Sequence, residues 1–140
     1  MATDTFTAVQ FGVGPIGARV VRSARDSGVE FVGAVDVDPE KVDRDLGEVA
    51  DLDESLGVPV TDDANEAIAA DPDVVFHSTV SSIEAARPQI ESILDAGANV
   101  VSTCEELVYP WRDHASTAAA IDELARDAGA TVLGTGINPG

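Results

Sequence analysis

Residues 7–17 read Thr-Ala-Val-Gln-Phe-Gly-Val-Gly-Pro-Ile-Gly. The first five of these residues are mostly β-prone and predict a strand. Three glycines with the spacing Gly-x-Gly-x-x-Gly follow, and residues 18–27 read as a helix that ends at Gly28. A second predicted strand, residues 29–35, is closed by Asp36, 19 residues after Gly17. A strand, a glycine loop, a helix and an acid at this spacing together form the dinucleotide-binding fingerprint.

The residues of this loop have separate roles in the predicted cofactor site. Gly12 permits the tight turn, Gly14 lets the backbone approach a pyrophosphate, and Gly17 lets the helix pack against the strand. Pro15 and Ile16 stand at the start of the helix, whose free N–H groups and partial positive charge attract phosphate. The alternative is a glycine-rich turn that binds nothing.

Asp36 is the residue that we expect to bind the adenosine ribose. Its carboxylate can accept hydrogen bonds from both ribose hydroxyls and would repel a 2′-phosphate, so we expect NAD as the cofactor, with NADP possible. Lys41 and Arg44 follow closely in the sequence, and their positive charges would weaken the preference for NAD over NADP. In the alternative interpretation, Asp36 only caps the end of its strand, and Asp38 caps a helix that begins at Pro39.

Strand and helix signals alternate along the rest of the chain. After the helix at Pro39, we expect a loop over residues 46–58 with at most a short helix, and then a weak strand at 58–60. A helix over 64–70, capped by Asp62 or Asp63, leads to a strand at 74–78. The remaining expected elements are a helix over 82–96 that contains Pro88, a strand at 99–102, a helix over 111–128 and a strand at 131–133. This alternation predicts the α/β class: a Rossmann fold with a doubly wound parallel sheet of about six strands and helices on both faces. Residues 1–140 would form one dinucleotide-binding domain.

The ends of two strands, at 74–78 and 99–102, are expected to line one crevice. Ligands of doubly wound sheets bind outside the carboxyl ends of the strands, where these two strands meet. Ser78, Thr79 and Thr103 place small hydroxyl side chains there. We expect them to contact the ribose and the carboxamide of a nicotinamide nucleotide.

Three further side chains at this edge are candidates for catalysis. His77 would serve as a general acid, and Glu105 or Glu106 would contact the substrate or the nicotinamide. The alternatives are a histidine packed on its strand and two solvated loop acids. Cys104 is interpreted as a small buried residue, because nothing in the sequence places a histidine beside it.

The charge of the chain excludes several partners. Its 140 residues include 26 acids and 8 bases, which gives a net charge of -18, and Lys41 is the single lysine. Such a field repels phosphate backbones and anionic membranes, so we expect neither nucleic acid nor membrane as a partner. Acids dispersed over the whole chain with so few lysines suggest a halophilic protein; the alternative is an ordinary acidic bacterial protein.

Composition also limits where in the cell the protein is expected and which kinds of metal or disulfide site it can contain. Hydrophobic residues make up 44% of the chain, which excludes intrinsic disorder, yet no apolar run reaches the roughly 20 residues of a membrane helix. The first residues lack the features of a signal peptide, so we expect a cytoplasmic protein. One cysteine excludes a disulfide framework and a multi-cysteine metal site, and we expect no metal.

Two longer strings carry a family resemblance. Residues 100–111 read Val-Val-Ser-Thr-Cys-Glu-Glu-Leu-Val-Tyr-Pro-Trp, and residues 134–140 read Gly-Thr-Gly-Ile-Asn-Pro-Gly. With Val-Asp-Val-Asp-Pro-Glu-Lys at 35–41 and the glycine loop, they resemble the N-terminal domain of dihydrodipicolinate reductase-like oxidoreductases, in particular the branch of 2,4-diaminopentanoate dehydrogenases. The resemblance covers nearly the whole chain.

This resemblance implies nicotinamide-dependent chemistry at the C=N or C–NH2 carbon of a small amino acid or cyclic imine. It also implies a second domain after residue 140 that supplies substrate contacts and self-association, so that the complete protein would be a homo-oligomer. We therefore expect this chain alone not to turn over substrate. The substrate and the direction of the reaction stay open, and a second class of function, a non-catalytic NAD(P)-binding sensor or regulatory module, also fits the sequence.

Overall fold

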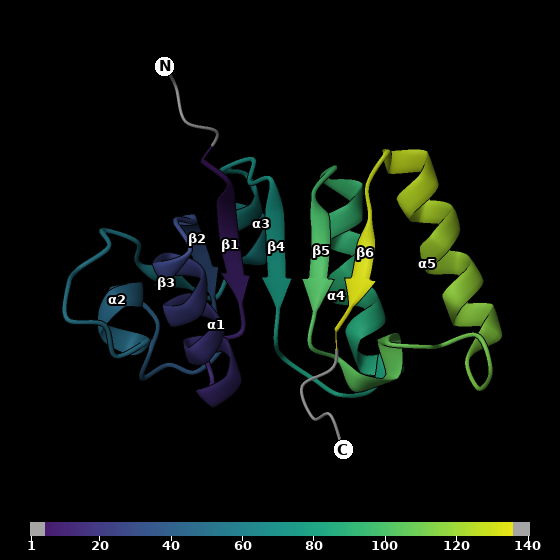
Figure 1. Cartoon of the computed structure of the whole chain (residues 1–140), viewed down its shortest axis with the longest axis horizontal. Coiled ribbons are helices and arrows are strands. Elements are labelled where there is room, and N and C mark those ends of the chain that lie inside the picture. The colour runs from purple at the N-terminus through teal and green to yellow at the C-terminus, as the bar shows by residue number, and fades with distance from the viewer. Residues whose placement is uncertain (1–4, 136–140) are drawn as a thin grey trace.

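Six strands form one parallel sheet in the order β3-β2-β1-β4-β5-β6 (Figure 1). The computed structural model describes residues 5–135. The strands are β1 (Thr7–Phe11), β2 (Glu30–Val35), β3 (Val60–Thr61), β4 (Val74–His77), β5 (Asn99–Ser102) and β6 (Val132–Gly134). The chain reverses its direction across the sheet between β1 and β4, so the loops after these two neighbouring strands diverge and leave space for a ligand.

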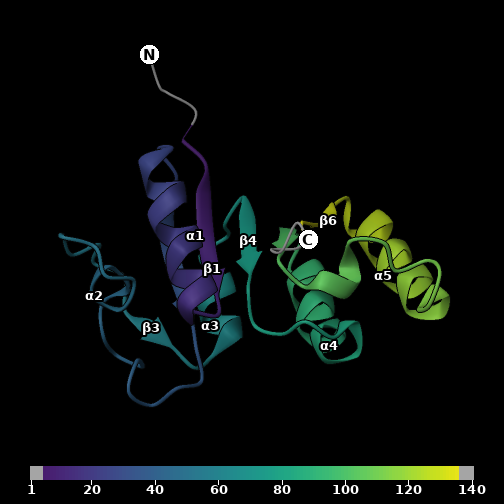
Figure 2. The same cartoon turned by 60° about the horizontal axis from the view of Figure 1, so that its bottom comes forward.

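Helices cover both faces of the sheet. They are α1 (Pro15–Asp26), α2 (Leu46–Val49), α3 (Ala64–Ile68), α4 (Ile83–Asp95) and α5 (Ala115–Ala128), with a short 3-10 turn η1 (Glu105–Leu107). One hydrophobic core lies beneath α1 and α2, and the other lies beneath α3, α4 and α5. Figure 1 places α1 in front of the sheet and α4 behind it, and Figure 2 shows the layers from another side. The predicted doubly wound Rossmann fold is confirmed.

Strand β1 lies in the middle of the sheet and contributes to both cores. Successive side chains of a strand point to opposite faces. Ala8 therefore joins the core beneath α1, whereas Val9 and Phe11 join the core beneath α4. Gln10 lies on the same face as Ala8 and is a polar exception, because its side chain is fully buried.

The helix predicted at Pro39 is wrong, because the chain turns there instead. The carboxylate of Asp36 accepts a hydrogen bond from the backbone N–H of Asp38, and that of Asp38 accepts one from Glu40, each at 2.9 Å. Short aspartate side chains that bond the backbone two residues on favour turns over helices. Asp43 then adopts a left-handed backbone with φ 71°, which a helix does not tolerate.

Helix α5 begins at Ala115 and not at Trp111, so the predicted start of this helix is also wrong. Residues 110–113 form turns, and the backbone N–H of His114 donates to the carbonyl of Pro110 at 2.8 Å. This turn leaves Trp111 outside the helix with 47% of its surface exposed.

Most of the other expected elements are confirmed. Asp63, and not Asp62, caps α3. Its carboxylate accepts hydrogen bonds from the backbone N–H groups of Asn65 and Glu66. Pro88 lies inside α4 as expected, and the short α2 is the helix of the acidic loop. Residues 136–140 of the glycine-rich string lie outside the described residues.

The acidic loop that contains α2 is organised by one side chain. The carboxylate of Asp45 accepts hydrogen bonds from the backbone N–H groups of Gly47, Leu56 and Val58 at 2.8–2.9 Å. Burial acts to raise the pKa of Asp45, but these hydrogen bonds outweigh it and hold the pKa below its ordinary value of 3.8. Among residues 5–135, no helix combines the length and the apolar character needed to span a bilayer.

Candidate functional site

The glycine loop between β1 and α1 is shaped by close contacts at two of its glycines. Gly12 has φ +97°, and a Cβ atom there would lie 2.7 Å from the carbonyl oxygen of Ser78. A Cβ atom on Gly17 would lie only 2.0 Å from the carbonyl oxygen of Gly12. Both positions therefore require glycine for the local backbone geometry.

Gly14 differs, because a Cβ atom there would meet no atom of the described chain within 4 Å. Its φ of -80° is accessible to any residue, so neither packing nor backbone conformation requires glycine. Open space beside this backbone is what the approach of a pyrophosphate needs.

The N-terminus of α1 faces the same part of the loop. Pro15 occupies the first helical position, and the first helical hydrogen bond runs from Ala18 N–H to Gly14 O at 2.9 Å. The N–H groups of Ile16 and Gly17 consequently have no acceptor inside the helix. These donors and the positive end of the helix dipole form an anion-binding position in a chain of charge -18.

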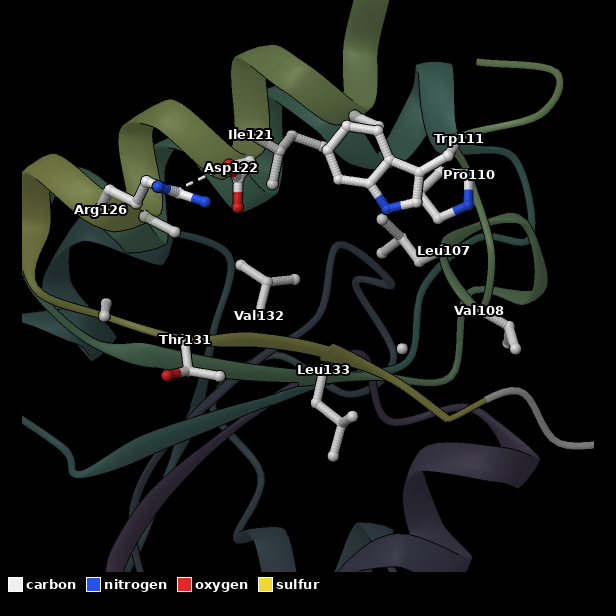
Figure 3. A pocket seen from close by; sticks show the side chains of 14 residues that line it. Leu107, Val108, Pro110, Trp111, Ile121, Asp122, Arg126, Thr131, Val132 and Leu133 are labelled. Carbon is white, nitrogen blue, oxygen red and sulfur yellow. Dashed lines mark hydrogen bonds and ion pairs between the residues drawn. The ribbon is translucent and has the colours of Figure 1, made fainter. Parts of the chain in front are cut away.

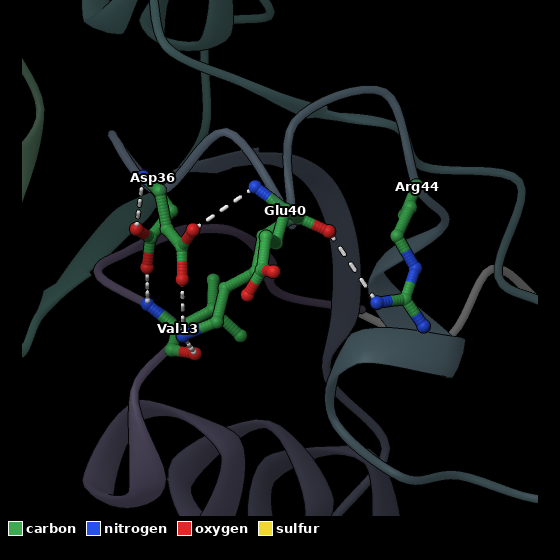
Figure 4. A network of polar contacts seen from close by, with 6 residues as sticks. Val13, Asp36, Glu40 and Arg44 are labelled. Atoms are coloured by element: carbon green, nitrogen blue, oxygen red, sulfur yellow. Dashed lines mark hydrogen bonds and ion pairs between the residues drawn. The ribbon is translucent and has the colours of Figure 1, made fainter.

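Asp36, directly after β2, lies beside the glycine loop (Figure 4). Its Oδ2 accepts a hydrogen bond from Val13 N–H at 2.8 Å, and its Oδ1 accepts one from Asp38 N–H at 2.9 Å. Each carboxylate oxygen can accept a further hydrogen bond, so both remain available to ribose hydroxyls. The loop thus fixes the carboxylate at the end of β2.

The two cations near Asp36 are already engaged. Lys41 Nζ donates to the carbonyl of Val13 at 2.9 Å and lies 3.9 Å from a carboxylate oxygen of Asp38. Arg44 pairs with Glu48 on α2 and also donates to a backbone carbonyl. Lys41 supports the glycine loop, whereas Arg44 points along the acidic loop and is not part of the pocket wall.

A cavity of about 420 Å³ lies between the glycine loop, the loop after β2 and the loop after β4. This volume is in the range of small-ligand pockets. Val37 is an apolar side chain on its wall, with 83% of its surface exposed. The lining residues are Phe11, Gly12, Gly14, Val35, Asp36, Val37, Asp38, Lys41, Ser78, Thr79, Val80 and Gln89.

Two more hollows lie beside this cavity. A small one of about 70 Å³ is bordered by Ile16, Ser78, Thr79 and Thr103, among others. A larger one of about 680 Å³ follows the flank of α1 and again includes Ile16 and Thr103. The structure therefore brings together the hydroxyl residues that the sequence placed at two separate strand ends, and their contacts with a cofactor remain a prediction.

Glu105 and Glu106, the two acids proposed for catalysis, lie in η1, and Glu106 stabilises the neighbouring helix α4. Its Oε1 accepts a hydrogen bond from Ile83 N–H at 2.8 Å and so caps the N-terminus of α4, and its Oε2 lies 3.4 Å from His114 Nε2. Glu105 is exposed. A catalytic role of either acid remains a prediction.

His77 is fully buried at the end of β4, in agreement with a histidine packed on its strand. Its ring lies 5.6 Å from that of Phe11, and burial holds its pKa below the ordinary value of 6.5 although a hydrogen bond with Gln89 opposes this. Cys104 is fully buried as expected, and burial raises the pKa of its thiol. Neither side chain is exposed to receive a substrate.

Sequence reasoning missed two glutamines. Gln10 on β1 donates from Nε2 to the carbonyl of Gly12 at 2.9 Å, so a buried amide supports the glycine loop from below. A glutamine in an otherwise apolar central strand was a signal for this role. Gln89 on α4 lines the cavity, but its position inside a long helix offers no such signal.

A separate hollow of about 410 Å³ lies at the edge of the sheet between α5, β6 and residues 107–111 (Figure 3). Its wall is largely apolar and includes Leu107, Trp111, Ile121 and Val132. It contains none of the site residues predicted from the sequence.

Comparisons with known proteins show a family to which this chain is similar. The profile of the family described as Dihydrodipicolinate reductase, N-terminus, matches residues 9–105. The chain is 44% identical over 68 residues to 2,4-diaminopentanoate dehydrogenase of Acetoanaerobium sticklandii, which covers 49% of the chain and 19% of that enzyme. It is 28% identical over 141 residues to amine dehydrogenase of Streptomyces virginiae, which covers 96% of the chain and 38% of that enzyme.

A solved structure extends the likeness to three dimensions. Amine dehydrogenase from Mycobacterium smegmatis superposes with a TM-score of 0.91 and 37% sequence identity over 95% of the chain and 39% of that protein. The chain thus spans less than two fifths of the length of each of these relatives. The matched family and the glycine-loop geometry lead to one conclusion: the chain belongs to the dihydrodipicolinate reductase N-terminus family, the NAD(P)-binding domain of a group of dehydrogenases.

Proposed function

We propose that this chain is the cofactor-binding part of an NAD-dependent oxidoreductase that acts at the amine-bearing carbon of a small amino acid or cyclic imine. The observation that carries the proposal is the open space at Gly14, which lies between the free N–H groups of α1 and the carboxylate of Asp36. This arrangement fits a pyrophosphate and an adenosine ribose side by side.

The residues of the chain would bind and orient the cofactor. The N–H groups at the start of α1 would hold the pyrophosphate, and Thr103 and Ser78 would border the nicotinamide half in the hollow beside Ile16. The bound nicotinamide supplies hydride transfer. Positioning the reacting carbon accounts for a large part of the rate of such reactions.

Two contacts support a preference for NAD over NADP. Asp36 places a carboxylate where a 2′-phosphate would lie, and like charges at this distance repel. Lys41, the nearest cation on the cavity wall, is already bound to the carbonyl of Val13 and lies near Asp38. Its charge is therefore partly compensated before any cofactor arrives.

The substrate class is proposed from the similarity to amine dehydrogenase and 2,4-diaminopentanoate dehydrogenase. Both names describe dehydrogenases of compounds that carry an amine. Because the chain matches less than two fifths of these enzymes, the residues that contact substrate and the surfaces for self-association are also proposals. The complete protein is tested by following NAD reduction with 2,4-diaminopentanoate and simple primary amines, and by light scattering for a homo-oligomer.

Cofactor binding is tested by fluorescence titration of the chain with NADH and NADPH in molar salt. We expect NADH to bind at least tenfold more tightly, a difference of about 1.4 kcal/mol. Asp36→Ser should narrow this ratio, whereas Asp62→Ser, which removes the same charge from an exposed position outside the cavity, should leave it unchanged. A parent chain that binds neither cofactor would refute the proposed function, and an unchanged ratio in Asp36→Ser would show that another group reads the ribose.

A further inference from the structure

Gln89 belongs to α4, yet its side chain reaches the wall of the cofactor cavity. Asp36 and the exposed Val37, from the loop after β2, line the same cavity. If Asp36 binds the adenosine ribose, the base attached to that ribose must lie in the same cavity, between these walls. Gln89 is therefore on the wall of the cavity that this base would enter.

The carboxamide oxygen of Gln89 is held by two donors. His77 Nε2 lies 2.6 Å from Gln89 Oε1, and the hydroxyl of Thr79 donates to the same oxygen at 2.6 Å. A carboxamide oxygen only accepts hydrogen bonds, so Nε2 of His77 carries the proton. His77 Nε2 also lies 3.0 Å from the hydroxyl oxygen of Thr79, which closes a compact three-membered cluster.

The other side of the His77 ring fixes this arrangement from the core. With its proton on Nε2, His77 accepts at Nδ1 from the hydroxyl of Ser102, 2.9 Å away. The Ser102 oxygen in turn accepts a hydrogen bond from the backbone N–H of Cys104 at 3.0 Å. Ser102 and His77 are both fully buried, so this chain of hydrogen bonds is shielded from water and directional.

The amide nitrogen of Gln89 is left without such a partner. Its oxygen is turned toward His77 and Thr79, and no acceptor between residues 5 and 135 receives a hydrogen bond from its Nε2. The nitrogen is attached to the same planar group, so the cluster that holds the oxygen also restricts the direction of the two N–H bonds. A fixed donor on the wall of an otherwise partly apolar cavity is typical of a specificity contact.

We propose that Gln89 is a specificity-determining residue of the cofactor site and donates a hydrogen bond from Nε2 to a ring nitrogen of the adenine base. This inference rests on the proposed function, because it needs a dinucleotide in the cavity. Adenine offers unprotonated ring nitrogens as acceptors for this N–H2 group. His77 and Thr79 act through Gln89 as positioning residues.

Gln89→Glu tests the donor directly, since the new side chain keeps an oxygen for His77 and Thr79 and replaces the N–H2 group by a second oxygen. We expect NADH affinity to fall at least tenfold, while reduced nicotinamide mononucleotide, which has no adenine, binds as it does to the parent. Both probes are followed by nicotinamide fluorescence. Ser92→Glu is the matched control, because it adds the same charge to an exposed position on α4 outside the cavity and should leave both affinities unchanged.

A second pair of variants tests the orientation of the amide without touching Gln89. Thr79→Ser keeps the hydroxyl that donates to Oε1 and should bind NADH within about twofold of the parent, whereas the isosteric Thr79→Val should lose severalfold in affinity. Melting temperatures of all variants establish that each is folded during the titration.

The outcomes separate this inference from the proposed function. A parent chain that does not bind NADH overturns both. A parent that binds NADH while Gln89→Glu binds it equally well, or loses NADH and reduced nicotinamide mononucleotide to the same extent, overturns only the role of Gln89. An unchanged affinity in Thr79→Val overturns the orientation by Thr79.

Discussion

Gly14 and Gly17 belong to one sequence motif, but the fold tolerates an added methyl group at Gly14 and not at Gly17. At Gly14 a Cβ atom meets nothing within 4 Å, and the backbone angle of -80° suits alanine. At Gly17 a Cβ atom would stand 2.0 Å from the carbonyl oxygen of Gly12, a distance at which backbone must move. Substitution of each by alanine therefore separates ligand binding from folding.

For Gly14→Ala, two small effects on stability oppose each other. Alanine reduces the entropy of the unfolded chain, which stabilises by about 0.4–1 kcal/mol, but it is a poorer N-cap residue than glycine for α1. The free energy of unfolding should remain within about 1 kcal/mol of the parent, which corresponds to a melting shift of no more than about 4 °C.

Cofactor affinity should respond far more strongly in this variant. The methyl group would occupy the space in which a pyrophosphate lies against the loop, and overpacking of this kind costs about 1–3 kcal/mol. At 1.4 kcal/mol per factor of ten, NADH should bind about 5- to 150-fold more weakly. Gly17→Ala should instead lose about 3 kcal/mol or more of stability and melt about 10 °C lower.

The assay combines thermal melting by circular dichroism with NADH titration of the same samples. Folded Gly14→Ala protein with parental NADH affinity would refute the pyrophosphate assignment. A large drop in the melting temperature of Gly14→Ala, or none for Gly17→Ala, would contradict the packing that separates the two glycines.

Three other predictions concern stability. The net charge of -18 predicts that the melting temperature rises steeply from 0.01 M to 1 M salt, as the screening length falls from about 30 Å to about 3 Å, and a flat response would contradict a halophilic protein. His77 has its pKa held below 6.5 by burial, so the unfolded chain binds its proton more tightly and stability should fall as the pH drops below 6.5. Melting curves at pH 7.5 and 5.5 should show a smaller difference in His77→Asn, and an equal difference would exclude this histidine as the source. Asp45→Asn places an amide against three backbone N–H donors and should cost about 1–3 kcal/mol in urea unfolding, whereas the exposed Asp62→Asn should cost less than 0.5 kcal/mol.

Local chemistry was sufficient for the elements that depend on few neighbours. The glycine loop, the acid after β2, a cap of α3 at Asp62 or Asp63 and the strand Asn99–Ser102 were predictable, because backbone conformation and capping act over only a few residues. The structure then selected Asp63. The helix expected at Pro39 is absent for an equally local reason. The side chains of Asp36 and Asp38 accept hydrogen bonds from backbone N–H groups two residues on, and this favours a turn over a helix.

The amino-acid sequence by itself determined the fold class and the position of the cofactor loop, because strand–glycine–helix spacing is a local signal and alternation of strands with helices admits few architectures. Only the tertiary structure placed Gln10 under the loop and joined Gln89 to His77 and Ser102. These side chains come from β1, α4, β4 and β5, and their contacts exist only after the strands have taken the order β3-β2-β1-β4-β5-β6. Hydrogen bonds between residues far apart in sequence carry no periodic signal, so packing alone decided which polar groups would meet in the cavity wall.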